Sequence, residues 1–372
     1  MSKTFDVCIR GDGVVGRTLA LLLARERLRV ALVARPEHAA AEPLAADVRA
    51  YALNSASRSL LQTLRVWPEA PLATAVKEMQ VWGDDGGRLD FSADSAALEA
   101  LAWIVDVPAL EQQLFQAVRY QPQIELVAAP VKAALNVICE GRTSASRDEI
   151  GVHWTVKPYQ QKAIAARLES DQPHGGVARQ WFANGDILAL LPLSGSDGNS
   201  VALVWSVSVE RATALEQLPP EEFCAALQAV CGQDAGNLRL ISERACWPLA
   251  LSNADHWVGT GWALAGDAAH TVHPLSGQGL NLGLADAACL AGVLAKREYW
   301  RALGDERLLR RYERARKADV AAIGTVTDGL HGLFAQTDDR WQMLRNWGLN
   351  GFSRSPSVTV PMAATSALRA LS

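Results

Sequence analysis

The chain has 372 residues, 49% of them hydrophobic, which is ample for a large buried core. Its 36 basic and 40 acidic residues give a net charge of −4, so no basic surface points to a nucleic-acid partner. Six cysteines without a C-x-x-C pair argue against a disulfide framework and a zinc site, and fit a reducing cytoplasm. We see no signal peptide, and no apolar run near the roughly 20 residues of a membrane-spanning helix.

The N-terminal part of the chain has the pattern of an α/β fold, beginning with a β-turn-α-β unit. The elements expected there are strand 5–9, helix 15–26, strand 29–34, a helix near 55–64 with Asn54 and Ser55 as cap candidates, strands within 76–91 and helix 107–120.

The middle of the chain is rich in strands, which predicts an antiparallel sheet inserted into the α/β domain. The elements expected from there on are strands 152–156, 163–168, 178–182, 187–192 and 201–208, helix 215–231, strand 262–265, a long helix 280–296 and helical segments to about residue 350.

A first glycine motif, Gly11-Asp12-Gly13-Val14-Val15-Gly16, stands between a predicted strand and a predicted helix. In such a motif the first glycine permits a tight turn, the second lets a pyrophosphate approach the backbone, and the third lets helix and strand pack closely. The alternative is a glycine-rich turn without a ligand.

Two details of this first unit are unusual for a dinucleotide site. Ala34 stands where an acid would hold the ribose hydroxyls, which weakens the case for NAD as the resident ligand. Asp12 places a carboxylate near the expected phosphates, and we expect its side chain to point to solvent.

A second motif, Gly266-Asp267-Ala268-Ala269-His270, follows a predicted strand and leads through residues 273–281 into a helix. The glycines and the asparagine at this helix entrance present free N–H groups to one spot, which suits the carbonyl and N1 edge of a flavin. The aspartate can accept hydrogen bonds from a ribityl chain. We expect His270 and His273 to orient the loop rather than to act in acid–base or metal chemistry.

The stretch GDAAHTVHPLSGQGLNLGLADAACLAGVL from residue 266 resembles the ubiquinone-biosynthesis hydroxylases, a branch of the flavoprotein monooxygenases related to p-hydroxybenzoate hydroxylase. Residues 49–54 (RAYALN) resemble a second element of that family, and Trp247-Pro248-Leu249 also fits. The resemblance covers nearly the whole chain.

The resemblance implies roles for individual residues. The glycines of the first motif would hold the FAD pyrophosphate, Arg49 would contact the cofactor, Asp267 the ribityl chain, and Pro274 would lie beside the isoalloxazine. The implied cofactor-binding residues are Gly11, Gly13, Val14, Val15, Gly16, Arg49, Asp267, Pro274, Gly277, Gly279, Leu280 and Asn281, and the implied catalytic residues are Pro274, Gly277 and Gln278, with no metal.

The resemblance also implies a fold and an activity. The fold is a Rossmann-like FAD-binding domain with an inserted antiparallel-sheet substrate domain and C-terminal helices. NAD(P)H would reduce FAD, and O2 would form a C4a-hydroperoxyflavin that hydroxylates an aromatic ring, here a polyprenylated phenol of ubiquinone biosynthesis. The implied segments are FAD-binding 1–75, 103–150 and 244–300, substrate domain 76–102 and 151–243, and C-terminal helices and tail 301–372.

The chain departs from the family pattern at several places. Glu140 replaces the aspartate of an Asp-Gly motif, Pro108 occupies a position expected to carry a polar FAD contact, and the stretch 126–138 is too short for the family's strand meander. Two or three strands are expected to be missing, which would expose a sheet edge.

Other functions stay open on the sequence alone. The enzyme could act on a small free phenol or benzoate, or the chain could be a degenerate flavoprotein that serves as a scaffold in a biosynthetic complex; a nicotinamide dehydrogenase leaves the second motif unexplained. Trp181 and Trp205 are weak candidates for a substrate pocket. A helical tail with Trp341 and Trp347 among arginines suggests peripheral contact with the inner membrane, although packing on its own domain is the ordinary interpretation.

Overall fold

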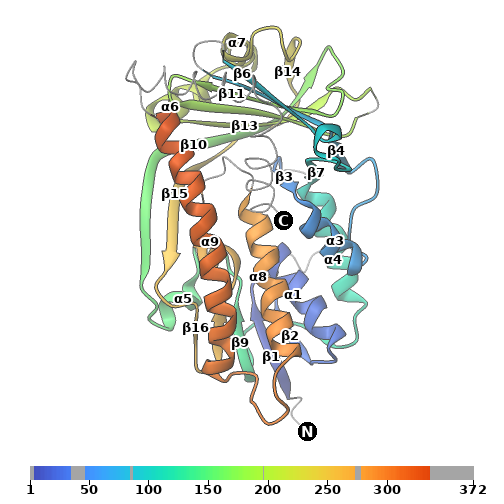
Figure 1. Ribbon diagram of the computed structural model, residues 1–372, viewed down its shortest axis with the longest axis vertical. Coiled ribbons are helices and arrows are strands. Elements are labelled where there is room, and N and C mark those ends of the chain that lie inside the picture. The colour runs from blue at the N-terminus through green and yellow to red at the C-terminus, as the bar shows by residue number, and fades with distance from the viewer. Residues whose placement is uncertain (1–3, 35–46, 84–86, 196, 273–277, 336–372) are drawn as a thin grey trace.

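The computed structural model describes residues 4–34, 47–83, 87–195, 197–272 and 278–335, with side chains as far as residue 322. In this part of the chain the strands form three sheets. Figure 1 shows the broadest sheet at one end of an elongated molecule, with a smaller sheet and long helices beneath it. The predicted mixed α/β fold is thereby confirmed.

A six-stranded sheet with the order β16-β17-β9-β1-β2-β8 forms the lower part of the molecule, and all its pairs except β16–β17 are parallel. Its strands are β1 (Phe5–Arg10), β2 (Val30–Val33), β8 (Ile124–Val127), β9 (Ala133–Ile138), β16 (Val258–Gly259) and β17 (Trp262–Leu264). Val7, Cys8 and Ile9 of β1 are fully buried. Burial on both faces explains why β1 is a continuous apolar run rather than an alternating one.

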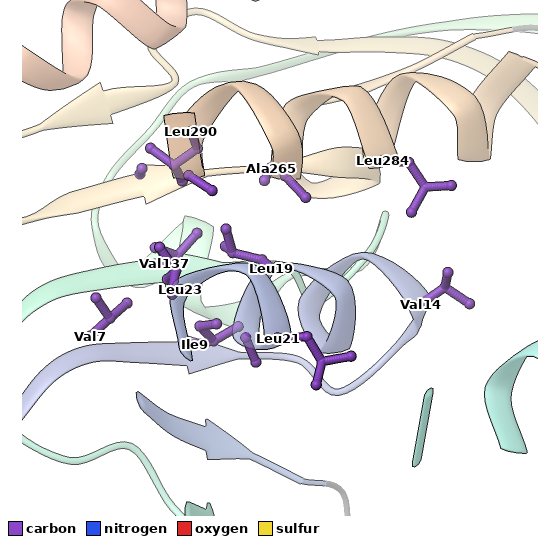
Figure 2. Packing of buried hydrophobic residues seen from close by; sticks show 14 of the residues in the cluster. Val7, Ile9, Val14, Leu19, Leu21, Leu23, Val137, Ala265, Leu284 and Leu290 are labelled. Carbon is purple, nitrogen blue, oxygen red and sulfur yellow. The ribbon is translucent and has the colours of Figure 1, made fainter. Parts of the chain in front are cut away.

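Four helices pack around this sheet. They are α1 (Val14–Arg25), α4 (Val107–Arg119), α8 (Gln278–Ala295) and α9 (Glu306–Ala335). Figure 2 shows Leu19 and Leu23 of α1 gathered with Val137 of β9 and Leu290 of α8. This cluster is the main hydrophobic core, and it packs α1 and α8 against each other and against the parallel sheet.

The second sheet has nine strands in the order β18-β15-β10-β13-β12-β11-β5-β6, with β14 paired to β10. Its strands are β5 (Glu78–Trp82), β6 (Arg88–Ser92), β10 (Trp154–Ser170), β11 (Val177–Ala183), β12 (Asp186–Pro192), β13 (Ser200–Ser208), β14 (Leu238–Leu240), β15 (Ala245–Ala254) and β18 (His270–Thr271). All pairs are antiparallel except β5–β11, as expected for an inserted sheet.

Two elements of this region differ from the sequence prediction. The expected strands 152–156 and 163–168 are one long strand, β10, whose pairing with β15 shifts register between Pro158 and Lys162. The expected helix 215–231 is two helices, α6 (Val209–Gln217) and α7 (Pro220–Cys231). Leu218 and Pro219 separate them, and Pro220 begins α7. Proline has no N–H to continue a helix but is tolerated in a first turn.

A small sheet, β3-β7-β4, connects the two larger ones. Its strands are β3 (Ala50–Leu53), β4 (Ala73–Val76) and β7 (Ala102–Asp106), and α3 (Ser55–Thr63) follows β3. As predicted, Asn54 caps α3, where its side chain accepts a hydrogen bond of 2.8 Å from Ser57 N. The short elements are η1 (Asp94–Ala96), α5 (Ala145–Glu149) and η2 (Gly266–Ala268).

The connection between β8 and β9 consists of residues 128–132, and no strand lies within it. Because β1 and β2 stand between β8 and β9 in the sheet, this short segment crosses both of them. β8 is left as an edge strand, and Leu126 is 41% exposed. The structure therefore has a direct crossover where the family pattern has a meander.

Among the described residues one helix, α8, is long and apolar enough to cross a membrane, although no such segment was expected from the sequence. More than half of this helix, 56%, is buried inside the protein. It packs against both α1 and α9, and burial in a protein core accounts for its composition.

Candidate functional site

Three sequence motifs leave the parallel sheet from neighbouring strand ends. Arg10 of β1 pairs with Ile138 of β9, which pairs in turn with Leu264 of β17, so the three strands end at one level. The first glycine motif, the Glu140 motif and the second glycine motif follow these ends. Ligands of open α/β sheets bind outside the carboxyl ends of the strands, which makes this edge the candidate site.

The glycines of the first motif have distinct surroundings. Gly11 has a φ of +108°, and a Cβ there would overlap the Cys139 carbonyl; a Cβ on Gly16 would overlap the Gly11 carbonyl. Gly13, by contrast, has nothing within 4 Å of where its Cβ would lie. Gly11 and Gly16 are thus required by close packing, whereas Gly13 borders open space that a ligand can enter.

The N-terminus of α1 faces the same space. Its N-cap, Gly13, makes no side-chain cap hydrogen bond, and the first turn of the helix contains no acidic residue. The first N–H groups of a helix carry a partial positive charge and bind anions. This end of α1 therefore suits a diphosphate.

Asp12 lies inside this loop, and the expectation that it points to solvent is wrong. Asp12 is only 1% exposed, and its carboxylate lies 3.5 Å from Arg17 Nη2. Arg17 also donates to the Glu111 carbonyl at 3.1 Å, which ties α1 to α4. The positive charge of Arg17 offsets the repulsion expected between the Asp12 carboxylate and a bound diphosphate, because an opposite charge stabilises a buried carboxylate.

Val15 joins the two glycine motifs. A Cβ on Gly266 would come within 3.3 Å of Val15 Cγ2, and a Cβ on Gly283 within 2.7 Å. The first turn of α1, the η2 turn and the second turn of α8 are therefore in direct contact. Segments more than 250 positions apart in the sequence form one surface at the strand ends.

Asp267 lies on the η2 turn, and its side chain is exposed. Burial nevertheless raises the pKa of its carboxyl, and nearby positive charges, Arg49 among them, oppose that shift. We interpret this combination as a carboxyl that is accessible to solvent yet closely surrounded by protein. We call the space at these strand ends, which is open beside Gly13, the cleft of the site.

Arg49 lies just before β3, and its guanidinium is fixed by hydrogen bonds to Asp47 and Tyr51. Its Nε lies 2.9 Å from both carboxylate oxygens of Asp47, Nη2 is 2.5 Å from Asp47 Oδ2, and Nη1 donates to Tyr51 Oη at 3.3 Å. The hydrogen bonds to Asp47 raise the pKa of Arg49, so the guanidinium is a fixed cation. Its side chain remains 44% exposed and is available to a ligand.

Asn281, on the first turn of α8, is engaged with the β3–α3 connection. Its Oδ1 accepts hydrogen bonds from Asn54 N at 3.0 Å and Ser57 Oγ at 2.7 Å, and its Nδ2 donates to the Ala52 carbonyl at 2.8 Å. The side chain thus joins two segments of the site, α8 and the β3–α3 connection.

The other residues predicted at this helix entrance divide into two groups. Gln278 is buried, Leu280 is partly buried, and Gly279 has nothing within 4 Å of where its Cβ would lie. Pro274 and Gly277, like His273, lie outside the described residues. Their roles stay predictions.

Glu140 does not present its carboxylate to the cleft. It accepts hydrogen bonds from Ser144 Oγ at 2.8 Å and from Ser146 Oγ and N at 2.6 and 3.1 Å. Burial opposes ionisation, but these bonds and the charge of Arg10 lower the pKa of Glu140. The longer acid therefore stabilises the start of α5.

Pro108 lies in the first turn of α4, where proline is favoured because the N–H that it lacks would have no partner within the helix.

Sequence reasoning missed three buried charged residues beneath the site. Arg147 is 3% exposed, stacks over Trp154 at 3.8 Å and donates to the Ala268 carbonyl at 3.3 Å. Asp286 and Arg316 form an ion pair of 2.7 Å. One signal was available, since Asp286 is the only charged residue in the apolar stretch that forms α8.

Trp181 and Trp205 do not line a pocket, because both lie in the core of the large sheet. Trp205 is fully buried beside Phe223, and Trp181 is 5% exposed and stacks on Trp82 with ring centroids 4.7 Å apart. Among the described residues no group of three or more His, Cys, Asp or Glu could hold a metal ion.

A cavity of about 280 Å³ lies beside β18, between β15 and α9. The exposed lining surface is mostly apolar. The lining residues are Leu251, Trp257, Val272, Val320 and Ala321, together with the polar residues Ser252, Asn253, His270, Thr271 and Lys317. One lining residue, His270, belongs to the second glycine motif. The cavity therefore adjoins the site on the side of the second glycine motif.

Comparison with known proteins identifies FAD as the cofactor of this family. Residues 112–326 match the family model described as FAD binding domain. The chain is 30% identical to the ubiquinone hydroxylase UbiL of Rhodospirillum rubrum, over 95% of this chain and 87% of that protein. It is 29% identical to the 3-demethoxyubiquinol 3-hydroxylase of Escherichia coli, over 94% of this chain and 95% of that one.

The fold has a similar counterpart among solved structures. PqsL of Pseudomonas aeruginosa, described as a probable FAD-dependent monooxygenase, superposes with a TM-score of 0.76 over 93% of this chain and all of that chain, at 21% identity. At this identity the likeness concerns the fold alone.

Proposed function

This chain belongs to the FAD binding domain family, and from that premise we propose that it is an FAD-dependent monooxygenase that hydroxylates an aromatic ring with NAD(P)H and O2. The observation that carries the proposal is the contact of Val15 with both glycine motifs, beside the open space at Gly13. One motif alone would suit many nucleotides. Two motifs joined at one cleft suit a ligand with a diphosphate and a flavin ring.

The residues present fit FAD. The backbone at Gly11, Gly13 and Gly16, with Val14 and Val15 at the start of α1, would hold the diphosphate. Arg49 would supply a fixed positive charge, and Asp267 would accept hydrogen bonds from the ribityl hydroxyls. The backbone of Gly277, Gly279, Leu280 and Asn281 would lie along the pyrimidine edge of the ring, with Pro274 and Gln278 beside it.

The chemistry depends on the cofactor, and the protein controls its surroundings. When bound, FAD passes electrons from NAD(P)H to O2 and delivers one oxygen atom to the aromatic ring. The chain must hold the ring of the substrate in line with the flavin and exclude water. The N-terminal end of α8 carries a partial positive charge, and it would stabilise negative charge on the pyrimidine edge of a flavin held there.

For the substrate we propose a polyprenylated phenol of ubiquinone biosynthesis. The names of two relatives support this class, and so does the apolar cavity beside β18, which could receive part of an isoprenoid tail. A small free phenol or benzoate is the second candidate. A comparison of the KM of a prenylated phenol with that of the same phenol without its tail would separate the two.

The remaining proposals concern location and partners. We propose a cytoplasmic enzyme that contacts the inner membrane peripherally or works within a biosynthetic complex, since a lipid-tailed substrate must be collected from such a place. The tail with Trp341 and Trp347, on which this idea first rested, lies outside the described residues. Flotation with liposomes tests the membrane contact directly, and protein left wholly in solution removes it.

The first experiment is an absorbance spectrum of the purified protein before and after addition of FAD. Bound oxidised flavin absorbs near ~375 and ~450 nm, and these bands should be followed by NAD(P)H oxidation that increases with a phenolic substrate. A spectrum that stays flat after reconstitution and desalting would instead support the degenerate scaffold.

A further inference from the structure

Asp286 lies at the centre of a buried cluster beside the η2 turn. Its Oδ2 accepts hydrogen bonds from Gly266 N at 2.9 Å and from His270 Nε2 at 2.7 Å, and its Oδ1 accepts one from Arg316 Nε at 2.7 Å. Asp286 itself is fully buried. Because Oδ2 is an acceptor, His270 must carry its proton on Nε2.

The cluster joins four elements. Gly266 belongs to η2, His270 to β18, Asp286 to α8 and Arg316 to α9. Gly266 begins the second glycine motif and directly precedes Asp267, and His270 ends the motif. Both ends of the second motif are therefore bonded to the same carboxylate.

Arg316 neutralises this carboxylate. It is 5% exposed, its Nη1 pairs with Asp319 at 2.5 Å, and its Nη2 approaches the Leu282 carbonyl at 3.4 Å. Burial would raise the pKa of Asp286, but His270 and Arg316 outweigh it and keep the carboxyl ionised. An isolated buried carboxylate would cost several kcal/mol, so the cluster depends on α9.

A second contact from α9 reaches the same region. Tyr312, one helical turn before Arg316, is fully buried and donates to the Leu264 carbonyl at 2.8 Å. Leu264 ends β17, two residues before Gly266. Figure 1 shows α9 running alongside α8 at this level. One face of α9 thus supports both the end of the strand and the turn that follows it.

We propose that Asp286 and Arg316 are positioning residues that fix the Gly266–Asp267 turn for the flavin. Cofactor binding then depends on the contact that Arg316 of α9 makes with Asp286. This inference rests on the proposed FAD-dependent activity. Neither side chain touches the cofactor; both act through the Gly266 amide and His270. Loss of the Arg316 contact should therefore change how the cofactor is held before it changes any step of chemistry.

The test compares Arg316→Met, Arg316→Lys and the control Arg314→Met, which alters an exposed arginine of the same helix. FAD titration of the apoproteins gives Kd, the flavin bands report the surroundings of the ring, and hydrogen exchange of the peptide 264–272 reports the turn without any cofactor. For Arg316→Met we expect Kd to rise about tenfold or more, shifted flavin bands and faster exchange. Arg316→Lys should recover part of the loss, and Arg314→Met should match the wild type.

Arg316→Met leaves a buried charge uncompensated, so the double variant Asp286→Asn/Arg316→Met, which removes both charges, serves if the single variant does not fold. An unchanged Kd with unchanged exchange in either variant would overturn the inference. If the wild type itself fails to bind FAD, the proposed function falls, and hydrogen exchange still decides whether Arg316 fixes the turn.

Discussion

Val15 lies so close to Gly283 that a Cβ on Gly283 would come within 2.7 Å of Val15 Cγ2. The contact brings the first turn of α1 against α8 at the point where the two glycine motifs meet. Valine is branched at Cβ and cannot easily rotate away from an added methyl group. We expect Gly283→Ala to push the helices apart, to lower the free energy of unfolding by about 1–3 kcal/mol and to weaken FAD binding.

Gly292 provides a matched control in the same helix. Nothing lies within 4 Å of where its Cβ would be, so Gly292→Ala should gain helix propensity and leave stability unchanged or raised by up to about 1 kcal/mol. Urea unfolding of both apoproteins, with FAD titration, makes the comparison. Equal stability of the two variants would show that the α1–α8 contact is not tight.

The ion pair of Asp12 and Arg17 should be needed for both folding and cofactor binding. Arg17→Met removes the cation from a carboxylate that is only 2% exposed, and we expect a loss of about 3–5 kcal/mol. The charge left beside the diphosphate should also weaken FAD binding. In the double variant Asp12→Asn/Arg17→Met both charges are absent, and much of the stability and affinity should return. Thermal unfolding with and without FAD measures both effects, and a double variant as unstable as the single one would refute the pairing.

Local patterns were enough to predict the elements that build the site. β1, α1 and the helix α3 with its Asn54 cap were expected close to their observed positions, because a strand–glycine turn–helix pattern and a capping residue depend on neighbours in the sequence. The family resemblance added the association of the two glycine motifs with one flavin. Its physical basis, the contact of Val15 with Gly266 and Gly283, became visible only in the fold.

The errors concern side chains whose partners are distant in the chain. Asp12 was expected in solvent because its partner Arg17 could not be assigned without knowing that α4 covers that side of α1. Trp205 was considered for a pocket, but α7 supplies Phe223 as its neighbour and closes the sheet over it. Asp286 carries a charge that only α9, 30 residues further on, explains. Burial and pairing of polar groups follow from tertiary contacts, which periodicity does not encode.

Asp186 should make the stability of the protein depend on pH. It is 6% exposed, and burial raises its pKa to about 6, although Arg211 at 2.8 Å opposes the shift. Because the folded state holds this proton more tightly than the unfolded chain, stability falls as the pH rises from about 4 to about 6 and stays lower above that. Asp186→Asn should therefore be more stable than the wild type at pH 7, by up to about 3 kcal/mol.

The advantage of Asp186→Asn should shrink steeply toward pH 4 and vanish near about pH 3, where the wild-type carboxyl is protonated in both states. Denaturant unfolding of the two proteins between about pH 3 and pH 8 measures it. Asp94→Asn is the control, since Asp94 is exposed and should give a difference near zero throughout. A constant difference between Asp186→Asn and wild type across this range would assign the effect to something other than ionisation of Asp186.

The cavity beside β18 leads to a prediction about substrate choice. Val320 of α9 lines this space of about 280 Å³, and Val320→Trp should fill much of it. If part of an isoprenoid tail occupies the cavity, the KM of a prenylated phenol should rise about tenfold or more, because the apolar surface of the tail loses its place. The KM of the same phenol without a tail should stay within about twofold of the wild type, since its ring lies at the flavin.

The control Val320→Ala enlarges the cavity and should not raise the KM of the prenylated phenol above that of wild type by more than about twofold. Product formation and NAD(P)H oxidation should be followed together, so that a change in substrate binding is separated from uncoupled oxidation. An equal rise for both phenols in Val320→Trp would mean that the substitution disturbs the site itself, through the neighbouring His270 and Val272. No change for either phenol would show that the isoprenoid tail does not occupy this cavity.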